Sequence, residues 1–124
     1  MERKIELLLE QVGRPYEMLN NDDGTYQGCF YPIQFLYPHL KRYKIRSQNH
    51  SKNYLYGIKK IQKHCYEISP DDMKSGDIIV TRFRDVLHVG IYLDYGKVIH
   101  VFNGHKLQIG RLKMFKDFQS YRVR

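Results

Sequence analysis

Short apolar runs in the C-terminal half of the chain have the pattern of paired β-strands. Val86–Leu93 and residues 98–102 are rich in β-branched and aromatic side chains, and Asp-Tyr-Gly at 94–96 separates them. Two such runs around a turn predict a β-hairpin. Ser-Gly-Asp at 75–77 predicts another turn, which leads into an earlier strand at Ile78–Phe83. This part of the chain is therefore expected to form an antiparallel sheet.

The N-terminal part of the chain has the spacing of helices instead. One apolar stripe predicts a helix over residues 2–12 that ends before Gly13; its members are Ile5, Leu8, Leu9 and Val12. A second helix is expected to begin around Pro32, because proline fits the first helical turn. Short strands are expected at 107–109 and 118–123. Helices first and strands last predict an α+β fold, with N-terminal helices packed on a mostly antiparallel sheet of about five strands.

Two histidines, His88 and His100, lie inside these otherwise apolar strands. Side chains alternate between the faces of a sheet, so the length of the loop decides whether the two rings share a face. A two-residue turn would place them on opposite faces, whereas an odd loop or a bulge at Gly96 would place both on one face. The rings would then lie within hydrogen-bond reach, as a base and its orienting group do. Taken singly, each is more often a satisfied or half-exposed side chain.

Cys29 lies at the expected start of the second helix. Unpaired backbone N–H groups and the helix dipole at such a position favour a thiolate and can stabilise an oxyanion. The alternative is a small buried apolar residue, which is the more frequent role of a cysteine without a disulfide. The two cysteines of the chain, Cys29 and Cys65, are too few for a disulfide framework. Cys65 is expected on the apolar stripe of a later helix.

The net charge of +8 comes from one segment, residues 41–64. Eight of the 21 basic residues and no acidic residue fall there, which leaves 13 basic residues against 13 acidic ones elsewhere. The eight are Lys41, Arg42, Lys44, Arg46, Lys52, Lys59, Lys60 and Lys63. Such a surface can contact an anionic polymer, such as nucleic acid or a cell-wall polymer, or it can be a solvated face. No nucleic-acid-binding motif accompanies it.

The length of 124 residues predicts a single domain over residues 1–124, with the basic segment as a peripheral insertion at about 41–64. No apolar run is as long as a membrane span. The N-terminal residues lack the features of a secretory signal peptide, so a cytoplasmic or phage-virion location is expected. The remaining histidines have no ligand-like spacing with the cysteines, so neither a metal nor another cofactor is expected.

Three blocks of sequence carry a family pattern. They are Gly-Arg-Pro-Tyr at 13–16, Gly28-Cys29, and Ser-Gly-Asp-Ile at 75–78 followed by His-Val-Gly-Ile-Tyr-Leu at 88–93 and His100. In this order they resemble the NlpC/P60 cysteine peptidases, a papain-like superfamily, over nearly the whole chain. In the family the nucleophile usually lies in the motif Asp-Cys-Ser-Gly. Here Gly28 precedes Cys29, and Phe30 and Tyr31 follow it. With its single-domain form and with Tyr121-Arg122 near the end of the sequence, the chain is similar to phage-tail-associated members of the family.

The resemblance implies a catalytic triad. Cys29 would be the nucleophile, His88 the general base and His100 the group that holds the tautomer of His88. Tyr16 would bind substrate or assist the oxyanion site, where the backbone N–H of Cys29 would donate. The implied reaction is hydrolysis of amide bonds in peptidoglycan stem peptides.

Three alternatives stay open. The unusual residues around Cys29 favour a non-catalytic member of the family, with a binding or phage tail-assembly role. The basic segment is compatible with a nucleic-acid binder. A papain-like acyltransferase or lipid amidase is disfavoured, because its histidines typically precede the cysteine in sequence.

Overall fold

The computed structural model describes residues 1–15, 28–40, 50–83, 86–102 and 105–124, and only the backbone at 28, 50–56, 83 and 86. The helices are α1 (Glu2–Leu9), α2 (Tyr31–Leu36) and α3 (His50–His64). The described residues also form the 3₁₀ turns η2 (Gly28–Phe30), η3 (Pro70–Asp72) and η4 (Leu112–Met114). The strands are β1 (Cys65–Ile68), β2 (Ile78–Phe83), β3 (Val86–Leu93), β4 (Lys97–His100), β5 (Gln108–Arg111) and β6 (Gln119–Val123).

The strands form one antiparallel sheet in the order β1-β6-β2-β3-β4-β5. The α+β class and the antiparallel sheet predicted from the sequence are confirmed, with six strands in this sheet. The additional strand is β1, which pairs with β6 from Cys65↔Val123 to Ile68↔Ser120. Cys65 therefore begins a strand directly after α3, and its expected place on a helical stripe is wrong. Four residues are too few to distinguish a strand from the end of a helix by periodicity.

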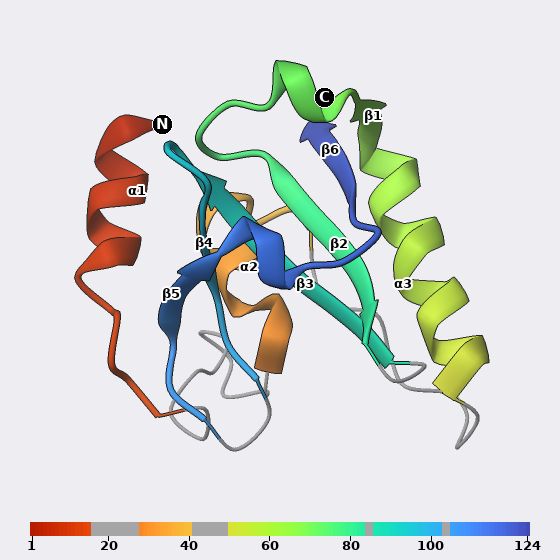
Figure 1. Cartoon of the computed structure of the whole chain (residues 1–124), viewed down its shortest axis with the longest axis horizontal. Helices are drawn as coiled ribbons and strands as arrows, with labels where there is room; N and C mark the ends of the chain where they lie inside the picture. Colours follow the sequence, from red (N-terminus) through yellow and green to blue (C-terminus); the bar gives the residue numbers. More distant parts are fainter. Residues whose placement is uncertain (16–27, 41–49, 84–85, 103–104) are drawn as a thin grey trace.

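One face of the sheet carries the main hydrophobic core, and the helices pack on this side (Figure 1). In Figure 1, α2 lies behind the sheet while α1 and α3 lie at its two sides. Leu8 from α1, Ile33 from α2 and Ile61 from α3 are at most 2% exposed. They pack with strand residues such as Val89 and Ile91. The burial of these aliphatic side chains supplies much of the driving force for the fold.

The segment of α3 that carries part of the basic charge belongs to this core. The helix packs against β3 and β1. Ile61 is buried, while Lys59 and Lys63 lie on the exposed side. The C-terminal half of α3 thus contributes Ile61 to the core and presents lysines at the surface. Whether residues 41–64 are an insertion relative to the family stays a prediction, and 41–49 lie outside the described residues.

The hairpin between β3 and β4 decides the orientation of the two strand histidines. Leu93 pairs with Lys97, so the loop contains an odd number of residues. Tyr95 and Gly96 take the left-handed backbone conformation, with φ of 65° and 70°. Glycine adopts this region without strain, and the exposed Tyr95 tolerates it in a tight turn. The prediction that an odd loop places both histidines on one face is confirmed, with Val89 on the other face in the core.

A buried ion pair ties the turn before β2 to β6. The carboxylate of Asp77, a residue only 5% exposed, accepts hydrogen bonds from Arg122 Nε at 3.0 Å and Arg122 Nη2 at 2.8 Å. It also accepts the backbone N–H of Lys74 at 2.7 Å. On the helix side, the hydroxyl of Tyr37 donates to the carbonyl of Gly76 at 2.6 Å. The Ser-Gly-Asp turn is therefore fixed from both the strand side and the helix side.

Candidate active site

The histidine pair lies on the sheet face opposite the helices. His88 is near the start of β3 and His100 ends β4, and they are 5% and 1% exposed. Nε2 of His88 lies 3.2 Å from Nδ1 of His100, and the rings meet edge to face. This contact is a hydrogen bond, because one of the two nitrogens can carry the proton and the other can accept it.

Two phenylalanines enclose the ring of His88. Phe102 stacks on it with 4.1 Å between ring centroids and an interplanar angle of 6°. Phe115, from the connection between η4 and β6, stacks at 5.4 Å and 24°. Both phenylalanines also meet the ring of His100 edge-on. The imidazoles are therefore held by aromatic packing as well as by their own hydrogen bond.

The hydrogen bond determines which nitrogen of His88 is available for chemistry. Nε2 faces His100, so Nδ1 is the ring nitrogen that remains to exchange a proton. If Nε2 carries the hydrogen and donates it to His100, Nδ1 of a neutral His88 is an acceptor. Such an arrangement suits a general base, with His100 as the ring whose hydrogen bond would select the tautomer of His88.

Burial keeps both histidines neutral. Desolvation, and secondarily the charge of His100, lowers the pKa of His88 to about 3. Desolvation also lowers the pKa of His100 to about 4. A charged imidazole would lose its hydration between the two phenylalanines, and this cost is the physical origin of both shifts. At neutral pH both rings are therefore uncharged, and the same burial makes them weaker bases than a solvated histidine.

These shifts predict a loss of stability in acid. The folded-state pKa values lie below the unfolded value of about 6.5, so the unfolded chain binds more protons below that pH. The stabilisation is complete above pH 6.5 and is lost as the pH falls toward the folded values. Each histidine should contribute about 1.4 kcal/mol per pH unit to the fall in unfolding free energy between about pH 6 and pH 4. Urea unfolding at several pH values would measure this slope.

The variant His100→Asn is the control for the predicted loss of stability in acid, because it removes one titrating group and leaves all carboxylates in place. Its slope between about pH 6 and pH 4 should be smaller than that of the wild type by about 1.4 kcal/mol per unit. Equal slopes would mean that His100 titrates alike in the folded and unfolded chains, which its burial does not allow.

Cys29 lies in η2, just before α2, and is half-buried. Its side chain packs against the core on the helix side of the sheet, whereas the rings of His88 and His100 lie on the other face. The turn η2 itself packs against β3, the strand that carries His88. Cys65 is only 2% exposed, and burial raises the pKa of its thiol to about 11. Both cysteines are thiols rather than disulfide partners. The two have different environments, and only Cys29 lies on an element beside the strand of His88.

Not all of the expected site residues belong to the part of the chain that the structure describes. Tyr16 lies outside the described residues, and for Gly28 only the backbone is described. Among the described residues, no group of histidine, cysteine or carboxylate side chains could hold a metal ion. In the same part of the chain, no helix is long and apolar enough to cross a membrane. Sequence reasoning missed Phe115, because it lies between two predicted strands and no local pattern places it beside the histidines.

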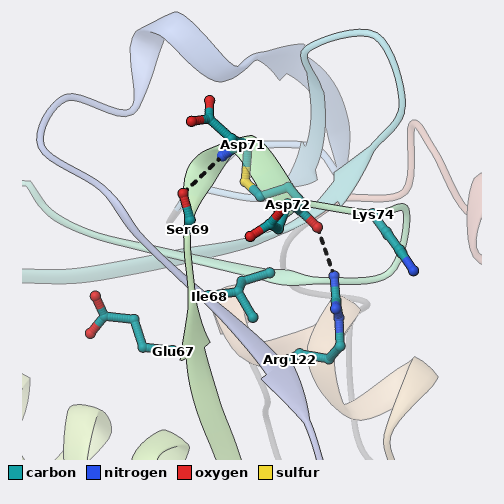
Figure 2. Close-up of a pocket in the computed structure, with 8 residues that line it drawn as sticks. Glu67, Ile68, Ser69, Asp71, Asp72, Lys74 and Arg122 are labelled. Atoms are coloured by element: carbon teal, nitrogen blue, oxygen red, sulfur yellow. Dashed lines mark hydrogen bonds between the residues drawn. The ribbon is translucent and has the colours of Figure 1, made fainter.

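A cavity of about 580 Å³ lies at the other end of the sheet (Figure 2). Its lining includes Asp72 and Lys74 before β2, and Arg122, which donates to the carbonyl of Asp72 at 2.9 Å. His88 is instead paired with Thr81, near the far end of β2. The cavity is therefore separate from the histidine pair, and its arginine already serves the ion pair with Asp77.

A sequence model of the NlpC/P60 family matches residues 29–122, which include Cys29, both strand histidines and the Asp77 turn. The chain belongs to the NlpC/P60 family. No curated protein matches the sequence. Family membership agrees with the resemblance carried by the motif blocks and with the α+β architecture.

Solved NlpC/P60 structures share the fold. One is a protein of Staphylococcus aureus described as similar to lipoprotein, with a TM-score of 0.64 and 20% identity over 97% of this chain. The present chain spans 40% of that protein. The other is RipD of Mycobacterium tuberculosis, with a TM-score of 0.59 and 21% identity over 99% of this chain and 95% of RipD. RipD is described as a non-catalytic NlpC/P60 domain protein adapted to peptidoglycan binding.

Proposed function

We propose that this NlpC/P60 protein is a cysteine amidase or endopeptidase that hydrolyses amide bonds of peptidoglycan stem peptides. Cys29 is the nucleophile, His88 the general base and His100 the group that orients it. The observation that carries the proposal is the hydrogen-bonded pair His88–His100, with Nε2 of His88 engaged and Nδ1 left for proton transfer. A pair of buried, oriented imidazoles on strands of this family has a direct use in nucleophilic catalysis.

The chemistry follows from these roles. Nδ1 of His88 takes the thiol proton of Cys29, and the thiolate attacks the carbonyl carbon of the amide. The backbone N–H of Cys29 stabilises the oxyanion, with Tyr16 as a substrate-binding or oxyanion residue. His88 then protonates the leaving amine, and a thioester remains on Cys29. Water, deprotonated by His88, hydrolyses the thioester and restores the thiol.

Family membership supports a peptidoglycan-related role, and the peptidoglycan binding described for RipD is consistent with it. In the NlpC/P60 family the usual substrate is a stem-peptide amide. The neutral state of His88 is required for the first step of the proposed reaction, because only an unprotonated imidazole accepts the thiol proton; the same burial makes His88 a weaker base than a solvated histidine.

A second candidate is a binding or phage tail-assembly protein that keeps the fold without catalysis. Two observations favour it: Phe102 and Phe115 enclose His88 and leave it only 5% exposed, and Cys29 packs against the helix-side core while the histidine pair lies on the other face of the sheet. The likeness to the non-catalytic RipD points the same way. A papain-like acyltransferase or lipid amidase has no comparable support.

Incubation with isolated stem peptides, followed by mass spectrometry, distinguishes the two candidates. The amidase predicts two product peptides whose masses sum to that of the substrate plus one water. A non-catalytic protein would bind the same peptides and leave them intact. Intact peptides together with saturable binding would replace the first proposal by the second.

The basic face of α3 is proposed to contact an anionic polymer. Lys59 and Lys63 are exposed one turn apart, and Lys60 is half-buried beside them. Burial first, and then the charges of Lys63, His39 and Lys60, lowers the pKa of His64 at the end of the helix. Of these causes, the charges of Lys63 and Lys60 reflect the basic face beside the end of the helix.

Reversing Lys59, Lys60 and Lys63 to glutamate should weaken binding to polyphosphate in a salt-dependent manner, because each lysine lost removes a released counterion. The measurement is the affinity at several salt concentrations. Reversal of Lys97, Lys113 and Lys116, which are exposed elsewhere, changes the net charge equally and is the control. Equal losses in both triple variants would show an effect of net charge only.

A further inference from the structure

Gly110 on β5 lies directly against the ring of His100. In the pairing of β4 with β5, Gly110 is opposite Val98 and Gln108 is opposite His100. Residues two apart on a strand share a face, so Gly110 is a diagonal neighbour of His100 on the same side of the sheet. The absence of a side chain at position 110 is what lets the ring lie there.

The space that a Cβ at position 110 would need is already occupied. Such an atom would lie 2.6 Å from Nε2, 3.3 Å from Cδ2 and 3.7 Å from Cε1 of His100. Real Cβ atoms are essentially never found within 3.0 Å of a neighbouring heavy atom. The three nearest atoms all belong to the His100 ring. A side chain at position 110 would therefore displace this ring before anything else.

The opposite edge of the same ring makes the functional contact. Nδ1 of His100 meets Nε2 of His88 at 3.2 Å, while Phe102 and Phe115 pack edge-on against the ring. His100 is 1% exposed, so the ring has little free space into which it could retreat. Its position is set by the strand backbone at Gly110 on one side and by His88 on the other.

We propose that Gly110 is a positioning residue for the catalytic pair: it holds the His100 ring where Nδ1 meets His88. The proposal rests on the amidase function only for its kinetic consequence, since the ring position can be observed without any substrate. A shift of about 1 Å in an orienting group can lower a rate by about 10²-fold.

A comparison with Gly90 shows why a substitution at Gly110 can displace the His100 ring without a large effect on folding. A Cβ at Gly90 would lie 2.5 Å from Cγ1 of Val98 and 3.0 Å from the carbonyl oxygen of Ile99. A substitution there collides with the core and the backbone of β4, so its effect would be mainly on folding. At position 110 the backbone φ is not left-handed, and the collision is with an imidazole alone.

Gly110→Ala should lower kcat for stem-peptide hydrolysis by about 10²-fold with little change in KM. It should also change the histidine ring signals in long-range ¹H–¹⁵N spectra, because the His88–His100 hydrogen bond is lost. Ile109→Ala is the control on the same strand, since this side chain is 43% exposed and lies on the other face. It should leave both the kinetics and the ring signals unchanged.

A second variant separates displacement of the ring from distortion of the strand. In a His100→Asn background the side chain is shorter, so Gly110→Ala should cause no further loss of kcat. An equal loss in both backgrounds, or unchanged ring signals in Gly110→Ala, would overturn the positioning role. If the wild type hydrolyses no stem peptide, the proposed function fails, and the ring signals still decide the role of Gly110.

Discussion

Cys29→Ala should abolish hydrolysis of stem-peptide amides, with a loss of at least about 10³-fold in kcat. The reason is that the substitution removes the sulfur that forms the thioester, and no other side chain in the mechanism can replace it. The fold should persist, because the change removes a single atom from a half-buried position. Release of product peptides would be followed by mass spectrometry, and folding by circular dichroism.

Cys65→Ala is the matched control for the loss of the thiol. It removes the same atom from a thiol that is 2% exposed on β1, outside the proposed mechanism. This variant should keep its activity, with a modest loss of stability from the cavity left in the core. Full hydrolysis by Cys29→Ala would remove Cys29 from the mechanism and with it the proposed triad.

Asp77→Ala should have the largest effect on stability, lowering the unfolding free energy by about 3 kcal/mol. The carboxylate is 6% exposed and accepts bonds from Arg122 and from the backbone of Lys74. Its removal leaves the N–H of Lys74 without its acceptor and Arg122 without its partner. Arg122 is 28% exposed and can regain part of its hydration, which keeps the loss from being larger. Chemical denaturation would measure the change.

Asp71→Ala is the control for this prediction, because it removes an exposed carboxylate from the same loop. Its unfolding free energy should stay within about 0.5 kcal/mol of the wild type. A similar midpoint for both variants would show that the ion pair of Asp77 contributes little and that the turn before β2 is fixed by other contacts.

Local rules in the sequence reduced the placement of the histidine pair to one question. Alternating side chains reduce the question to the parity of one loop, and Gly96 made an odd loop possible. The pairing Leu93↔Lys97 settles that parity. The class of the fold followed in the same way, from helical spacing before Leu36 and strand patterns after Ser75. Each of these features depends on residues close together in the chain.

The features that the sequence could not predict depend on distant residues. Phe115 stacks on His88 although the two are far apart in sequence, and nothing in its neighbours indicates this. In the sequence, Gly110 is an ordinary glycine in a short strand. Its role depends on the ring of His100, which only the folded structure places beside it. The pairing of β1 with β6 likewise places Cys65 beside Val123, although the two residues are far apart in the sequence. Such contacts follow from packing rather than from local spacing.

The competition between the two cysteines for limiting iodoacetamide tests the central claim, that Cys29 is a nucleophile activated by His88, most directly. Cys29 should be alkylated first near neutral pH, because the pKa of Cys65 is raised to about 11 by burial. His88→Ala should slow the labelling of Cys29, and His100→Ala should slow it less, because water or a polar neighbour can replace part of an orienting group. Preferential labelling of Cys65, or equal rates at Cys29 in the wild type and His88→Ala, would contradict the account.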